Sequence, residues 1–329
     1  MRDGGVGTIN DLGAFLEPPR WASQLIQGEG RGEWSKVAPQ IAVRTVACQD
    51  FAMVSARVVG AVRMSALQLQ QATIVAYESI ASQLAEMSAA HAVRIWNFIP
   101  RILAPLGDLP HRYMAFNAGR FAVYTKWYES IAGVRRCAVT ASGVGHGGDD
   151  LLVHCLAASR PGRPLENPRQ TPSYRYSDRY GPMPPCFARA LCLRLPNDRE
   201  VLLVGGTASV TGEDTVHPAN PAAQADETFL NLAAIVGCAE GIGAEVSING
   251  HCTELLDRFH TLRVYVVRQR DVGEIRTIVE RRFPSLDDVE YVRACLCRPD
   301  LLLEIEGVAE LRQLVSTGVG NECRVLDTL

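Results

Sequence analysis

DLLLEIEGV, at residues 300–308, is echoed by DLLVHCLAA, at residues 150–158. The two stretches align without a gap at a constant offset of 150 residues. Self-similarity at a fixed period predicts that the chain is a duplicated domain. Within the echo, one copy has Glu304 where the other has His154. This difference in chemistry points to an active site in the copy that contains the carboxylate.

The elements predicted around the two stretches come in the same order. In the first half, the hydrophobic pattern predicts a helix over 65–87, a strand over 92–99, a second helix within 113–131, and strands over 135–140 and 150–158. In the second half, it predicts a helix over 227–240, a strand over 262–268, a helix over 273–282, and strands over 289–297 and 301–308. The repeated order supports the duplication.

A change of composition separates the two halves. The segment 160–185 is rich in Pro, Arg, Tyr and Ser and contains seven prolines. Such a composition is typical of a linker or a long functional loop. We therefore expect an N-terminal domain at 1–159, a connection at 160–190, and a C-terminal domain at 191–329 that contains the acidic strand.

Charge and composition exclude several classes of partner. The 33 basic and 36 acidic residues give a formal net charge of −3, and the basic residues form no block. A nucleic-acid site or a polybasic membrane patch is therefore not expected. No uninterrupted apolar run reaches about 18 residues, so we expect neither secretion nor membrane insertion. A small neutral or anionic metabolite is the expected partner.

The ten cysteines show no framework spacing, which is typical of reduced thiols in a cytosolic protein. The histidines show no metal-ligand spacing such as H-x-x-x-H, so no metal site is predicted.

The acidic strand offers the first candidate for catalysis. Strand side chains alternate, so Leu302, Glu304 and Glu306 share one face. Both carboxylates could be solvated on an outer face. Alternatively, the face lines a cleft between domains or subunits, where desolvation would raise a carboxyl pKa and suit it to general-acid work.

Cys297 lies just before this strand. A connection of three residues would pair Glu304 with Ala294 and turn Cys297 to the opposite face. A connection of four would pair Glu304 with Cys295 and place Cys297 on the side of the carboxylate. The sequence leaves both pairings open, and a buried inert thiol is the alternative role.

Two further segments contain residues suited to ligand binding. The turn GGTAS at 205–209 follows an apolar strand, and its small residues would let a ligand approach the backbone, although a plain tight bend also fits. Arg112, Tyr113 and Arg120 would lie near one another on a helix. Arginine forks bind carboxylates, although ordinary surface arginines fit this pattern too.

The motifs resemble two related groups of proteins. GTAS at 206–209, QADETFLN at 224–231 and LEIE at 303–306 resemble the RidA-like (YjgF-like) fold. The combination with WNFIP at 96–100, RY at 112–113, FNAGR at 116–120 and PMPPCFARA at 182–190 resembles the chorismatases. The resemblance implies an α+β fold of two tandem RidA/YjgF-like (chorismate-mutase-like) domains, with mixed sheets and helices packed on one face.

The resemblance also implies an activity, the removal of pyruvate from chorismate without metal or organic cofactor. It implies that Glu304 donates the proton that the enol ether of chorismate needs. Because the substrate is a dianion, guanidiniums should receive its carboxylates. By position, the expected substrate-binding residues are Arg112 with Tyr113, Arg120, Arg189 and Arg293, together with Thr207 and Ala208 of the small-residue turn.

Product and assembly are implied less directly. Resemblance to members with a cysteine at the Cys297 position favours hydroxybenzoate products, whereas an alanine at Ala208 does not clearly favour an aromatic product. We expect 3-hydroxybenzoate, alone or with 4-hydroxybenzoate. The alternatives are hydrolysis to a dihydroxycyclohexadienoate, and a RidA-like imine deaminase or metabolite-binding module. A homotrimer in the cytosol is the assembly that the resemblance suggests.

Overall fold

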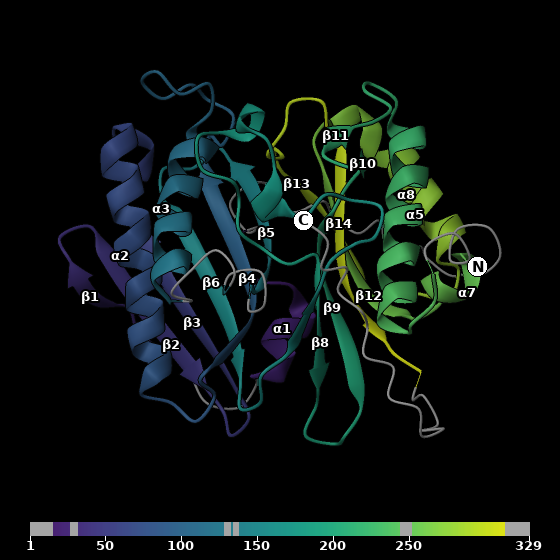
Figure 1. The fold of residues 1–329 in the computed structure, drawn as a ribbon, viewed down its shortest axis with the longest axis horizontal. Coiled ribbons are helices and arrows are strands. Elements are labelled where there is room, and N and C mark those ends of the chain that lie inside the picture. Colours follow the sequence, from purple (N-terminus) through teal and green to yellow (C-terminus); the bar gives the residue numbers. More distant parts are fainter. Residues whose placement is uncertain (1–15, 27–31, 128–132, 134–137, 244–251, 313–329) are drawn as a thin grey trace, which may run out of the picture.

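The structure is a computed structural model that describes residues 16–26, 32–127, 133, 138–243 and 252–312. Two mixed six-stranded sheets lie between two layers of helices, so that each sheet has its long helices on one face (Figure 1). This arrangement confirms the predicted α+β class, with two tandem units of mixed sheet and helix.

The first half of the chain builds one sheet. Its strands lie in the order β1 (Ser35–Ala38), β2 (Ile41–Ala47), β3 (Phe51–Val58), β6 (Leu151–Ala158), β4 (His91–Pro100) and β5 (Thr140–His146). Helices α2 (Ala66–Ala85) and α3 (Arg112–Trp127) cover its outer face. Helix α2 begins with a capping box, in which the side chains of Ser65 and Gln68 each accept the other's backbone N–H.

The second half repeats this topology. Its strands lie in the order β13 (Val289–Arg293), β12 (Phe259–Val266), β14 (Leu303–Glu310), β9 (Glu200–Thr207), β8 (Ala190–Arg194) and β7 (Arg163–Leu165). Helices α5 (Pro221–Ala239) and α8 (Val272–Arg282) cover the outer face. In each half the last strand inserts into the middle of its sheet, β6 between β3 and β4 and β14 between β9 and β12. The echoed stretches therefore form equivalent strands.

Short elements complete the described part of the chain. They are helices α1 (Arg20–Leu25) and α7 (Cys252–Leu256), the paired strands β10 (Val210–Thr211) and β11 (Asp214–Thr215), and the 3-10 turns η1 (Ala61–Arg63), η2 (Ser173–Arg175), η3 (Asp178–Tyr180) and η4 (Gln269–Asp271).

Several element boundaries differ from the sequence prediction, and two of the differences are large. Helix α5 begins at Pro221 rather than at residue 227, because proline suits the first helical turn and the Asn220 side chain caps the Ala223 N–H at 3.0 Å. Half of the strand predicted over 135–140 lies outside the described residues, and strand β5 begins at Thr140.

The hydrogen-bonded register corrects the offset between the two copies. A bulge in β4 lies opposite Leu156 of β6, and the matching bulge in β12 lies opposite Val308 of β14. Counting along the strands from these bulges, His154 is equivalent to Glu306, not to Glu304. The sequence echo is misleading because Leu301 and Leu302 match the start of β6 in type but precede β14.

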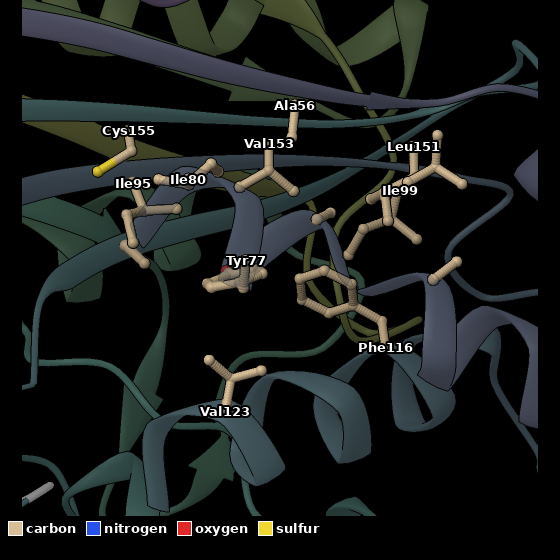
Figure 2. Close-up of a cluster of buried hydrophobic side chains, with 14 of the residues drawn as sticks. Ala56, Tyr77, Ile80, Ile95, Ile99, Phe116, Val123, Leu151, Val153 and Cys155 are labelled. Carbon is tan, nitrogen blue, oxygen red and sulfur yellow. The ribbon is translucent and has the colours of Figure 1, made fainter. Parts of the chain in front are cut away.

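Three clusters of buried side chains hold these layers together. Figure 2 shows the first, where Tyr77 of α2 and Phe116 and Val123 of α3 pack on Ile95 and Val153 of the first sheet. A second cluster lies between the second sheet and its helices, and a third lies between the two sheets. Each large apolar side chain buried in this way contributes about 1.5–3 kcal/mol. The third cluster fixes the sheets relative to each other, and so fixes any site between them.

The predicted connection at 160–190 runs from one sheet to the other. Its residues 163–165 form β7, the edge strand that pairs with β8. Farther along it, Arg189 N–H donates to Leu165 O at 3.1 Å, and Ala188 pairs with Thr140 of the first sheet. The segment therefore contacts both sheets.

Candidate active site

A cavity of about 400 Å³ opens between the two sheets. This volume lies within the usual range for small-molecule sites. Strands β5, β9 and β14 contribute Ser142, Gly206 and Glu304 to its wall. Helix α3, the 160–190 segment, the residue after β9 and the residues before β14 contribute the others that matter here, which are Tyr113, Arg120, Tyr176, Tyr180, Arg189, Ala208, Cys297 and Arg298.

Glu304 is a buried carboxyl on the cavity wall, with only 5% of its surface exposed. Burial, and then the negative charge of Glu306, raise its pKa to about 8. Below that pH the group is protonated and neutral. It can therefore give a proton to a bound molecule at neutral pH, as a general acid must.

A glycine makes room for this carboxyl. A Cβ atom at position 206 would lie 2.0 Å from Glu304 Oε1 and 3.1 Å from Ser142 Oγ. No side chain other than hydrogen fits at Gly206 unless Glu304 moves. At this position the small residue leaves space for the acid, which differs from the predicted close approach of a ligand to the backbone.

Glu306 is the second carboxylate on this strand face, and it is 1% exposed. It accepts hydrogen bonds from Arg94 Nη2 at 2.6 Å, Trp96 Nε1 at 2.9 Å and Tyr265 Oη at 3.1 Å. A fourth donor is the Ser142 hydroxyl. The interpretation that both carboxylates are solvated is therefore wrong, and the alternative of a cleft between domains fits the structure.

Cys297 lines the cavity, although neither predicted pairing of its connection is present. Strand β12 lies between β13 and β14, so Glu304 is opposite Tyr265 rather than Ala294 or Cys295. The chain leaves β13 after Arg293 and crosses to the first sheet, where Cys295 and Gly145 exchange backbone hydrogen bonds of 2.7 and 3.0 Å. This crossing brings Cys297 to the cavity. Burial raises the pKa of its thiol to about 11, so the thiol is neutral at neutral pH.

Three cavity arginines have no ion-pair partner within 4.0 Å in the described ranges, namely Arg120, Arg189 and Arg298. Arg120 is 1% exposed and donates to Asn117 Oδ1 at 2.9 Å. Arg189 donates to Tyr176 Oη at 2.6 Å. Arg298 lies 4.1 Å from the centre of the Tyr180 ring and donates to a backbone carbonyl at 2.7 Å. Guanidiniums buried without carboxylate partners are suited to binding an anion.

Three predicted binding residues do not line this cavity. Arg112 donates to the backbone carbonyls of Ala61 and Val62. Adjacent helix residues diverge by about 100°, so Arg112 lies off the face from which Tyr113 and Arg120 line the cavity. Two others point elsewhere: Thr207 Oγ1 donates to Gly205 O at 3.0 Å, and Arg293 donates to Gln269 Oε1 at 3.3 Å.

Among the cavity residues named above, sequence reasoning missed Ser142, Tyr176, Tyr180 and Arg298. Ser142 lies on β5, whose strand was predicted too early in the chain. Tyr176 lies in the proline-rich segment, and only its unusual composition could have indicated it. Arg298 directly follows Cys297 and could have been proposed from the same connection.

His154, the residue that the echo set against Glu304, does not face the cavity. It is 1% exposed, and its ring nitrogens bond to Ser55 Oγ and to Leu16 O, both at 2.8 Å. Burial lowers its pKa to about 4, so the ring is neutral near pH 7. It therefore ties strands β3 and β6 to the N-terminal segment.

Replacing His154 by Ala should destabilise the protein more than it slows turnover. Loss of the ring leaves Ser55 Oγ and Leu16 O without their partner, which costs about 1–3 kcal/mol for each buried group left unsatisfied. Thermal unfolding should show a lower Tm, while kcat measured well below that Tm stays unchanged. A large loss of kcat with an unchanged Tm would contradict this assignment.

One cavity is thus lined by a buried carboxyl whose pKa is raised to about 8 and by three guanidiniums that have no ion pair among the described residues. This arrangement is suited to acid-catalysed chemistry on a small anion. The described residues contain no group of three or more His, Cys, Asp or Glu that could hold a metal ion. None of their helices is long and apolar enough to cross a membrane.

Comparison with known proteins gives the family. The model of the N-terminal region of FkbO/Hyg5-like chorismatases matches residues 35–157. A 3-hydroxybenzoate synthase of Streptomyces hygroscopicus is 33% identical over 246 residues, which cover 72% of this chain and 69% of that protein. A chorismatase of Streptomyces rapamycinicus is 31% identical over 239 residues, with the same coverage of 72% and 69%. The chain belongs to the chorismatase family.

A solved structure agrees with this membership. A chorismatase crystal structure superimposes with a TM-score of 0.70 at 26% sequence identity, over 85% of this chain and 80% of that one. The predicted resemblance to the chorismatases is thus confirmed by both sequence and structure.

Proposed function

We propose that this protein releases pyruvate from chorismate by general-acid protonation of the enol ether, with 3-hydroxybenzoate as product, alone or beside 4-hydroxybenzoate. The observation that supports this most directly is the protonated Glu304 facing three unpaired guanidiniums in one cavity. The names of the relatives, chorismatase and 3-hydroxybenzoate synthase, support the same substrate and product.

Glu304 acts at the first step of the proposed reaction. It gives its proton to the methylene carbon of the enol ether, which leaves an oxocarbenium ion and a glutamate carboxylate. Cleavage of the bond between the ring carbon and the ether oxygen then releases pyruvate and leaves the ring carbon electron-deficient. Loss of one proton makes the ring aromatic, and this proton returns to the Glu304 carboxylate. Hydroxybenzoate and pyruvate together contain all the atoms of chorismate, so this route consumes no water, whereas formation of a dihydroxycyclohexadienoate consumes one. Neither route requires a metal or an organic cofactor.

The arginines receive the two carboxylates of the substrate in this proposal. Arg120 lies on α3 beside Tyr113, whose pKa burial raises to about 12, so that the phenol stays neutral and can donate a hydrogen bond. Arg189 and Arg298 lie together at the tyrosines of the proline-rich segment, where both approach the Tyr176 ring. Two separate cationic groups match a substrate with two separate carboxylates.

Cys297 sets the product in this proposal, because its neutral thiol lines the cavity next to the acid. Replacing Cys297 by Ala should change the ratio of hydroxybenzoate to dihydroxycyclohexadienoate in favour of the hydrolysis product. Product chromatography after complete conversion measures this ratio. The matched control is Cys295→Ala, since Cys295 is exposed and does not line the cavity. An unchanged mixture from the Cys297 variant would mean that another residue sets the product.

Incubation of the purified protein with chorismate tests the proposed function. Chromatography should show pyruvate and a hydroxybenzoate appearing in equal amounts as chorismate disappears. Absence of pyruvate would contradict the proposal and favour the RidA-like imine deaminase or binding module.

We also propose a cytosolic location for the protein. We propose that it forms a homotrimer, and light scattering tests this assembly. We propose that the chain divides into domains 1–159 and 191–329, with the connection 160–190 between them.

A further inference from the structure

Glu304 and Glu306 are neighbouring buried carboxyls, and the hydrogen bonds around Glu306 bear on which of the two is protonated. Its Oε1 accepts from Trp96 Nε1 and Tyr265 Oη, and its Oε2 accepts from Arg94 Nη2 and the Ser142 hydroxyl. All four partners act as donors here. A protonated carboxyl needs an acceptor for its own hydrogen, and Arg94 and Trp96 can only donate, so this environment favours the ionised form.

The hydrogen bonds of Ser142 support this assignment. Its Oγ lies 2.5 Å from Arg94 Nη2 and 3.0 Å from Gly206 N, and both of these groups can only donate. The hydroxyl hydrogen is therefore directed to its third partner, Glu306. Ser142 thus links Glu306 to Gly206, the residue that the Glu304 carboxyl lies against.

Glu304 and Glu306 lie two residues apart on one face of β14, and both are buried. Two carboxylates this close in a site of low polarity cannot both be ionised without a large electrostatic cost. Glu306 has the ion pair with Arg94, so Glu304 is the group that keeps the proton. The charged or titratable groups that act on Glu304 from all sides are Arg94, Tyr113, Arg189, Cys297, Arg298 and Glu306.

We propose that Glu306 is a positioning residue of the active site, whose fixed negative charge, held by Arg94, Trp96 and Ser142 of the first sheet, keeps the proton on Glu304. This inference rests on the proposed role of Glu304 as the acid and extends it. The first unit of the chain thereby controls the protonation of a catalytic group in the second.

Infrared titration without substrate tests the proposal directly. Every titration is made in a Glu166→Gln background, because burial raises the pKa of Glu166 to about 7 and its carboxyl would add a second signal. This reference protein should show a protonated carboxyl at pH 7 that is lost near pH 8. Glu304→Gln should abolish this signal, and its persistence would place the proton on Glu306 and overturn the proposal. Glu306→Gln should move the midpoint down by at least one pH unit, a tenfold change in the acid dissociation constant. An unchanged midpoint would also overturn it.

The pH profile of turnover gives a second readout. Because the acid must be protonated, kcat/KM should fall as pH rises through the pKa of Glu304, and in Glu306→Gln this fall should begin at lower pH. A merely structural role would lower activity equally at all pH values. Glu310→Gln is the matched control, since Glu310 is an exposed residue of the same strand paired with Arg199, and its midpoint should equal the wild-type value. If the wild type releases no pyruvate, the proposed function fails, while the infrared titration still decides the role of Glu306.

Discussion

Replacing Glu304 by Gln should lower kcat for pyruvate release by about 100- to 10,000-fold, the contribution of a positioned general acid. The amide has nearly the shape of the protonated carboxyl but has no proton of suitable acidity to give. Because Glu304 is neutral in the folded protein below about pH 8, the change removes no ion pair and the fold should persist. A coupled assay for pyruvate measures the rate, and thermal unfolding checks the fold.

The control for this experiment is Glu310→Gln, which makes the same chemical change at the exposed end of β14. We expect wild-type kcat from it. Near-normal turnover in the Glu304 variant would place the acid elsewhere in the cavity. An equal loss of kcat in both variants would mean that the changes act by disturbing strand β14, and not by removing the Glu304 carboxyl.

Replacing Gly206 by Ala should lower kcat by roughly 100-fold, because a displacement of about 1 Å of a catalytic group can cost that much. The added methyl group would lie 2.0 Å from Glu304 Oε1, so the carboxyl must move away from the position it now occupies. The backbone hydrogen bond from Gly206 N–H to Ser142 Oγ can remain, so we expect a smaller effect on stability than on turnover. Steady-state kinetics together with the Tm separates the two effects.

Gly273→Ala serves as the matched control, since Gly273 is an exposed residue of α8 and a Cβ atom there would meet nothing within 4 Å. Alanine is also the better helix former, so this variant should be at least as stable as the wild type and fully active. Full activity of the Gly206 variant would show that the reaction does not depend on the present position of the Glu304 carboxyl.

Much of the fold could be predicted from local patterns, but register could not. The helices and strands of both halves follow hydrophobic periodicity, and their repeated order gave the duplicated architecture. The predicted alignment of the two echoed stretches was wrong by two residues. Similarity of residue type had matched Leu301 and Leu302 to strand residues of the first copy. Only the hydrogen-bonded pairing, with its bulges in β4 and β12, aligns His154 with Glu306.

Site residues that lie on one helix within a family motif could be predicted from the sequence. Contacts between residues of different elements could not. Tyr113 and Arg120 share a helix face, and both line the cavity, whereas Arg112 lies out of phase with them. Arg94 and Ser142 reach Glu306 from 212 and 164 residues away in the sequence. No periodicity or spacing connects residues at that separation, because their contact depends on how the two sheets pack.

The shared network at β14 also makes each half of the chain depend on the other. In the first copy, the position equivalent to Glu304 is occupied by Leu152, so that copy has no acid of its own. Instead, its residues Arg94, Trp96 and Ser142 donate hydrogen bonds to the Glu306 carboxylate of the second copy. A chain reduced to its second half would lack these three donors, and a chain reduced to its first half would lack both Glu304 and Glu306. Neither half contains the whole network, so both must be present for it to form.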